Sequence, residues 1–296
     1  MDIKTIIKLA ILITLVLAVI IPVCTFLLRQ PVLIVSETSS LTLYGEGRIN
    51  RAVLLSSLSL FRPVKVVEVA NNAGADIIRY AVAEISLRPY SVVFPRRFAQ
   101  SAEIYQTQNP EVRTIVLEGR YTEDQINREG VYSYSSDTES DFFRAGYAAA
   151  AFTESRIANI AVFIEPAQYS IYGFQAEKAF LQGLDDLGSM ANAYFFTSFS
   201  DFPEDLEISC IVIAGAGWEF LEGGSTGVPV ILFSWLDPFM APADIVLMID
   251  DSPFAQLSDA VLLSEAGFGR GSIKSRFSVI NTGIIGSGLL RNINNM

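Results

Sequence analysis

The stretch that decides the fold runs from Glu139 to Gly188 and reads ESDFFRAGYAAAAFTESRIANIAVFIEPAQYSIYGFQAEKAFLQGLDDLG. Its alanine-rich first part has apolar side chains at helical spacing between Phe143 and Ala150. The apolar run Asn159–Ile164 is typical of a strand covered on both faces. A second amphipathic helix follows Pro166. Helix–strand–helix is the repeating unit of a doubly wound sheet, so this stretch predicts the entry to a second α/β lobe.

Similar units lie on both sides of this stretch. Apolar runs predict strands of a first lobe at 31–35, 64–70, 90–94, 112–117 and 131–134, and of a second at 159–164, 194–197, 209–214, 228–233, 245–249 and 272–280. Helices are expected at 48–60, 75–86 and 253–266, loops at 36–47 and 118–128, and a partly disordered tail after 280. We expect the chain to cross the hinge more than once. The expected division is a membrane segment at 1–30, an N-lobe of 31–137 plus 250–268, and a C-lobe of 138–249 plus 269–296.

Composition narrows the function. The chain has 296 residues, no histidine, two cysteines and a net charge of −11. Without histidine the commonest general base and metal ligand are missing, and no nucleophile motif or metal cluster is found, so we expect neither catalysis, nor a metal, nor a cofactor. The acidic balance makes nucleic acid a poor partner.

The N-terminal segment from Leu9 to Leu28 carries no charge, and Lys4 and Lys8 precede it. About 20 apolar residues suffice to span a bilayer, and the lysines favour a cytoplasmic N-terminus. Three interpretations stay open: an uncleaved signal anchor, a lipoprotein acylated at Cys24, and a cleaved signal peptide. All three place the rest of the chain outside the cytoplasmic membrane.

Several stretches resemble a known family. They begin with RAGYAAA at 144–150, YGFQAEKAF at 172–180 and IAGAG at 213–217, followed by VPVILFSWLD at 228–237 and GFGRG at 267–271. In order and spacing they are similar to the type 1 periplasmic solute-binding proteins, most of all the basic membrane protein branch, which includes purine-nucleoside-binding lipoproteins. The resemblance covers the chain from Pro31 onward. It implies an α/β fold with two lobes, each a mostly parallel doubly wound sheet, preceded by the membrane segment.

The chain differs from that family at the positions where family members contact their ligand. Ser234 and Leu236 stand where aspartates are usual, and Asp237 stands in a glutamine position. A lysine expected after the next strand is replaced by the sequence Asp250-Asp-Ser. The resemblance therefore implies the fold, while the ligand could differ or be lost.

Candidate ligand residues follow predicted strand ends, because ligands of such sheets sit beyond the carboxyl ends of the strands. Trp218, Trp235 and Tyr44 could stack on a flat ligand face, with packing as the alternative. Arg96 and Arg97 could clamp an anion, although water around both is the favoured interpretation. The full candidate set is Tyr44, Asp137, Trp218, Ser234, Trp235, Asp237 and Asp250. For Asp137 a helix N-cap is the favoured alternative.

These features predict an extracytoplasmic, membrane-anchored protein that closes two lobes on a small polar ligand, nucleoside-like or sugar-like, for an ABC-type importer. The alternative is an interaction or sensory protein that kept the fold and lost the ligand. We expect Tyr44, Trp218 and Trp235 to line one interlobe cavity, with Asp237 and Asp250 at its rim.

Overall fold

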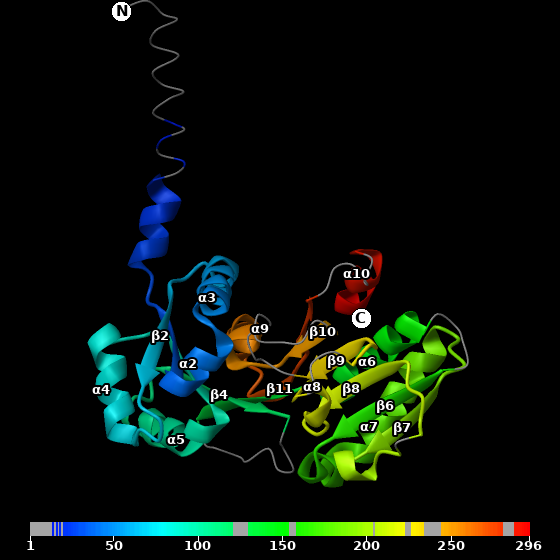
Figure 1. Cartoon of the computed structure of the whole chain (residues 1–296). Coiled ribbons are helices and arrows are strands. Elements are labelled where there is room, and N and C mark those ends of the chain that lie inside the picture. The colour runs from blue at the N-terminus through cyan, green and yellow to red at the C-terminus, as the bar shows by residue number, and fades with distance from the viewer. Residues whose placement is uncertain are drawn as a thin grey trace, which may run out of the picture.

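The computed structural model describes residues 14, 16, 18, 20–120, 130–153, 158–203, 205–222, 226–233, 244–280 and 287–296. It consists of two six-stranded α/β sheets, one in each lobe (Figure 1). Long apolar runs form the strands, as predicted, because both faces of each sheet are covered by helices or loops. Within the described residues no helix is long and apolar enough to span a membrane. The predicted segment 9–28 lies partly outside those residues.

The first sheet is parallel throughout and has the order β11-β5-β4-β3-β1-β2. Helices α3 and α9 cover one face, and α4 and α5 cover the other. The strands are β1 (Val32–Glu37), β2 (Val64–Val69), β3 (Ser91–Pro95), β4 (Arg113–Gly119), β5 (Val131–Ser136) and β11 (Arg270–Ile273). The helices are α2 (Thr38–Tyr44), α3 (Glu46–Leu60), α4 (Ala75–Ile85), α5 (Ala99–Gln108) and α9 (Pro253–Glu265), with a short 3-10 turn at Arg96–Phe98.

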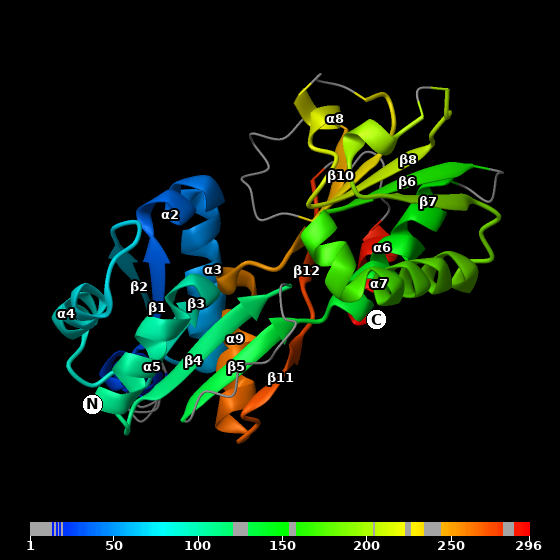
Figure 2. The same ribbon diagram turned by 90° about the horizontal axis from the view of Figure 1, so that it is seen from below.

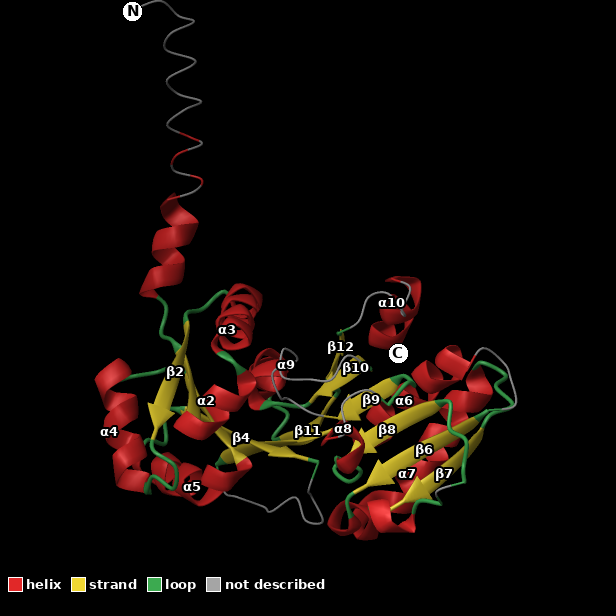
Figure 3. Ribbon diagram, viewed as in Figure 1, coloured by secondary structure: helices red, strands yellow, loops and turns green. Residues whose placement is uncertain are grey.

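The second sheet has the order β12-β10-β9-β8-β6-β7, with β12 antiparallel to β10 and the other pairs parallel (Figure 3). One face packs on α6, α7 and α10, and the other carries a cluster of phenylalanines. The strands are β6 (Asn159–Ile164), β7 (Asn192–Phe196), β8 (Cys210–Ala214), β9 (Val230–Phe233), β10 (Ile245–Asp250) and β12 (Arg276–Val279). The helices are α6 (Thr138–Thr153), α7 (Pro166–Asp186), α8 (Glu219–Glu222) and α10 (Ser287–Asn295), with a 3-10 turn at Phe199–Asp201.

Helices α6 and α7, which flank β6 in the sequence, pack at very close range. A Cβ at Gly146 would overlap the carbonyl of Phe180, and a Cβ at Gly183 would overlap the carbonyl of Phe143. Each glycine therefore lets its own helix approach the backbone of the other. The small side chains of the alanine-rich helix α6 therefore allow the close packing of α6 against α7.

The chain passes between the sheets three times, after β5, after β10 and after β11 (Figure 2). The predicted pair of mostly parallel α/β sheets is confirmed. The strand predicted at 272–280 is wrong in one respect: it is two strands, and its first part, β11, pairs with β5 in the first sheet. The segment from 269 to 273 therefore joins the first sheet and not, as expected, the second. Helices α2 and α10 also occupy stretches predicted as loop and partly disordered tail.

Candidate functional site

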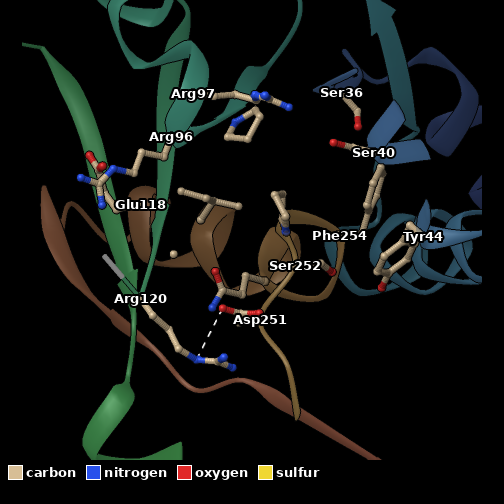
Figure 4. A pocket seen from close by; sticks show the side chains of 15 residues that line it. Ser36, Ser40, Tyr44, Arg96, Arg97, Glu118, Arg120, Asp251, Ser252 and Phe254 are labelled. Atoms are coloured by element: carbon tan, nitrogen blue, oxygen red, sulfur yellow. Dashed lines mark ion pairs between the residues drawn. The ribbon is translucent and has the colours of Figure 1, made fainter. Parts of the chain in front are cut away.

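A cavity of about 340 Å³ lies at the carboxyl edge of the first sheet (Figure 4). Residues that follow β1, β3 and β4 form its sides, and the turn into α9 closes it. This is the edge where ligands of open α/β sheets bind. Its lining consists of Ser36, Ser40, Tyr44, Pro95, Arg96, Arg97, Leu117, Glu118, Gly119, Arg120, Asp251, Ser252, Pro253, Phe254 and Gln256.

Arg120 is the buried cation of this lining, with only 8% of its surface exposed. Its Nε lies 3.5 Å from Asp251 Oδ2, the ion pair drawn as a dashed line in Figure 4. Toward the second lobe its guanidinium lies 4.4 Å from the centre of the Phe233 ring, and its Nη2 is 3.9 Å from Asp141. Neither Nε nor Nη2 has a hydrogen-bond partner in the described part of the chain. Arg120 thus has two buried donor atoms with no hydrogen-bond acceptor among the described residues.

Tyr44 and Phe254 form an apolar wall, with ring centres 5.1 Å apart. The Tyr44 hydroxyl donates to Asp250 Oδ2 at 2.8 Å, and Arg48 Nη2 donates to the same oxygen at 2.6 Å. The other oxygen of Asp250 accepts from the Ser252 amide at 2.9 Å. Asp250 is 4% exposed and stands behind the wall, outside the lining. The structure therefore brings Tyr44 and Asp250 together, but it places only Tyr44 on the cavity.

The buried Asp141 and the partly buried Asp251 lie on either side of Arg120, and Arg120 lowers the pKa of each carboxyl group. Burial raises the pKa of Asp141 above its ordinary value, while Arg120 and Arg144 oppose the rise. Burial likewise raises the pKa of Asp251, with Arg120 opposing and Asp250 adding to the rise. The carboxylate of Asp251 can accept a hydrogen bond from a ligand, and the neighbouring guanidinium of Arg120 can donate one. That combination suits a neutral group bearing hydroxyls, which both donate and accept.

The two arginines after β3 line the cavity and are also exposed to solvent. Arg97 forms an ion pair with Glu37, at the end of β1. Arg96 extends toward Glu118 in Figure 4, and Glu118 accepts a hydrogen bond from Ser133 at 2.8 Å. Both side chains are exposed, as the favoured interpretation expects, but Arg97 is also paired with Glu37 and both lie at the cavity. The cavity lining therefore contains both arginines and carboxylates.

Asp137 lies at the crossing after β5. Its carboxylate accepts from the Ser140 amide at 3.0 Å, in the first turn of α6, and its own amide donates to the Ile273 carbonyl at 2.8 Å. This is the N-cap arrangement that the sequence favoured. Asp137 does not line the cavity.

Trp218 lies on the second lobe, away from the cavity that Tyr44 lines. It packs against the apolar cluster of β8 and its neighbours, and its Nε1 donates to the Gly215 carbonyl at 3.2 Å. Ser234, Trp235 and Asp237 lie outside the described residues, so their part in a site stays a prediction.

Sequence reasoning missed Arg120 and Asp251 as site residues. Both follow strands of the two sheets, Arg120 directly after β4 and Asp251 directly after β10. Their position at strand ends was the available signal, but no motif distinguished them from other charged loop residues.

No protein-family model matches the chain, and no curated protein shows significant sequence similarity to it. Solved structures do resemble it. A transcriptional activator of the comK gene from Bacillus halodurans shares 14% identity and a TM-score of 0.57 over 90% of this chain and 95% of that one. An ABC transporter solute-binding protein from Conexibacter woesei shares 12% identity and a TM-score of 0.56 over 90% and 94%.

A third similar structure is a periplasmic solute-binding protein of an ABC transporter from Actinobacillus succinogenes, solved with D-allose. It shares 12% identity and a TM-score of 0.50 over 89% of this chain and all of that one. The architecture is therefore that of the two-lobed type 1 periplasmic-binding fold. The fold is shared by binding proteins and transcriptional regulators, and at these identities the likeness establishes the fold alone.

Proposed function

We propose that the chain is an extracytoplasmic, membrane-anchored solute-binding protein that closes its lobes on a small polar ligand, sugar-like or nucleoside-like, and delivers it to an ABC-type permease. The observation that carries the proposal is Arg120, a buried guanidinium on the cavity whose Nε and Nη2 have no hydrogen-bond partner in the described chain. Leaving such donors unsatisfied costs free energy, which a ligand oxygen would recover.

The cavity chemistry favours a neutral polyhydroxylated ligand. Arg120 would donate to ligand oxygens, Asp251 would accept from ligand hydroxyls, and the Tyr44–Phe254 wall would cover an apolar ring face. Arg120 also contacts Phe233 and Asp141 of the second lobe. A ligand bound to Arg120 would therefore lie next to the contact between the lobes, where its binding could favour lobe closure. The sugar-bound neighbour from Actinobacillus succinogenes has this fold and is consistent with the proposal.

A thermal-shift screen of neutral sugars, sugar acids and nucleosides tests the proposal, because a ligand of the native state raises the melting temperature by mass action. Calorimetry on each hit then gives the affinity. Arg120→Ala should weaken the hit roughly tenfold to hundredfold. The control is Arg79→Ala, because Arg79 is a partly exposed arginine on α4 paired with Asp76. Equal affinity in both variants would remove Arg120 from the site.

A second candidate is a sensory or interaction protein that no longer binds a solute. It is favoured by the internal pairing of charges around the cavity: Arg97 with Glu37, Arg48 with Asp250, and Arg120 with Asp251. Carboxylates that are already held by arginines of the protein are less available to a ligand. A screen with no hit at millimolar ligand would favour this candidate.

A further inference from the structure

A row of leucines on α3 points to solvent instead of to a core. Leu54, Leu55 and Leu58 are 59%, 45% and 63% exposed, and Phe61 after the helix is 40% exposed. They recur at i, i+1, i+4 and i+7 and so share one face. Exposed apolar side chains gathered on one helix face mark an interaction surface more often than scattered ones do.

Helix α3 lies beside the point where the N-terminal apolar segment leaves the first lobe (Figure 1). Residues 20–28 are helical, and Leu27 and Leu28 are 66% and 86% exposed. The ring of Phe26 contacts that of Phe61 at 5.8 Å between centres. Arg29 donates to the Phe61 carbonyl at 3.2 Å, so the segment is joined directly to the end of α3.

Several arginines occur on α3 and on the segments at its C-terminal end, although the chain as a whole carries a charge of −11. Arg29 and Arg51 are exposed, Arg62 is half-buried over the Tyr90 ring, and Arg88 is exposed in the loop after α4 next to Leu87, which is 86% exposed. A second cavity of about 550 Å³, at the amino edge of the first sheet, has a lining that includes Gln30, Arg88, Arg113 and the acidic Glu111.

We infer that this face, Leu54, Leu55, Leu58, Phe61 and Leu87 with Arg29, Arg51, Arg62 and Arg88, rests on the surface of the bilayer that holds the N-terminal segment. The leucines would enter the headgroup–acyl boundary, and the arginines would pair with anionic phospholipid phosphates. The inference rests on the membrane attachment in the proposed function. It orients the molecule with α3 against the membrane and the cavity at the carboxyl edge turned away from it.

A lipid-depth measurement on the full-length chain tests this orientation. In a Cys24→Ser background the remaining Cys210 is fully buried, so Leu58→Cys can be labelled selectively with an environment-sensitive fluorophore. The matched control is the same label at Phe174→Cys, because Phe174 is 79% exposed on α7 of the other lobe. The probes are vesicles of phosphatidylcholine, with or without phosphatidylglycerol, that carry a headgroup-level quencher.

We expect several-fold stronger quenching at 58 than at 174, and a further increase with phosphatidylglycerol that high salt removes. Arg88→Glu should reduce the phosphatidylglycerol effect without changing the melting temperature. Equal quenching at the two positions overturns the inference. Protection of position 58 that grows with protein density in the vesicle also overturns it and indicates a second copy as the occupant.

Flotation of vesicles with the chain that keeps Cys24, the residue that a lipoprotein would acylate, separates this inference from the proposed membrane attachment. A chain that floats with the vesicles but shows no quenching at 58 contradicts the α3 contact alone. A chain that stays in the soluble fraction contradicts membrane attachment, and the inference with it. Neither result bears on the cavity, which the ligand screen tests independently.

Discussion

The Tyr44 hydroxyl donates a hydrogen bond to Asp250 at 2.8 Å, joining residues 206 positions apart in the chain. Asp250 is the last residue of β10 in the second sheet, whereas Tyr44 ends α2 in the first lobe. Arg48 reinforces the contact through its ion pair with the same carboxylate and lies 4.3 Å from the centre of the Tyr44 ring. This contact therefore ties the two lobes at one of their crossings.

Tyr44→Phe removes one donor to a buried carboxylate and keeps the ring. We expect the free energy of unfolding to fall by about 1–2 kcal/mol, because Arg48 and the Ser252 amide still satisfy Asp250. Urea unfolding measures the loss. Tyr80→Phe is the matched control, because Tyr80 is 67% exposed and should leave stability unchanged. An equal loss in the two variants would contradict the assigned role of the Tyr44 hydroxyl.

Asp251→Asn should flatten the pH dependence of stability. The folded-state pKa of Asp251 is raised above the ordinary 3.8, mainly by burial. The folded protein therefore holds this proton more tightly than the unfolded chain. That contribution to stability is fully present below pH 3.8 and is lost as pH rises through the raised pKa.

The wild type should thus lose stability relative to Asp251→Asn between acid and neutral pH. Chemical unfolding of both proteins across that range measures the difference. Asp76→Asn, at a side chain that is 79% exposed, should track the wild type. A difference that grows in the opposite direction would contradict the raised pKa.

Gly146→Ala should destabilise the protein although alanine is the better helix former. The added methyl would overlap the Phe180 carbonyl and force α6 and α7 apart, at a cost of about 1–3 kcal/mol. Gly47→Ala in α3 is the control, because no atom lies within 4 Å of its added Cβ, and it should stabilise by up to about 1 kcal/mol. Melting temperatures of the two variants should move in opposite directions.

Trp218→Ala should lower the melting temperature without changing the affinity for a ligand found in the screen. The indole packs on the β8 cluster and donates to the Gly215 carbonyl, away from the cavity. Calorimetry and thermal unfolding on the same sample separate the two effects. A loss of affinity with an unchanged melting temperature would instead indicate that Trp218 contacts the ligand.

The buried strands could be predicted because parallel strands covered on both faces read as continuous apolar runs, as in Asn159–Ile164. The passage of the chain from β11 in the first sheet to β12 in the second could not be predicted. Residues 272–280 alternate like one strand, and the break at Lys274 and Ser275 has no glycine or proline to mark it. That break is fixed by contacts distant in sequence: Ser275 bonds to Asp141, and its carbonyl accepts from Arg144.

The site was partly predictable for a similar reason. Strand ends predicted Tyr44 on a cavity with Asp250 at its rim; the two are hydrogen-bonded, but Asp250 lies outside the lining. The role of Arg120 depends on Phe233 and Asp141, which only the folded second lobe brings to it. A lone arginine after a strand carries no local signal of that burial.

The third crossing has a consequence for the order in which the protein is made. Strand β11, which completes the first sheet beside β5, follows all strands of the second sheet except β12 in the chain. A ribosome therefore releases β5 long before its neighbour exists, and the growing chain carries an open strand edge through the synthesis of the other lobe. Neither sheet can be obtained whole by cutting the chain at one point.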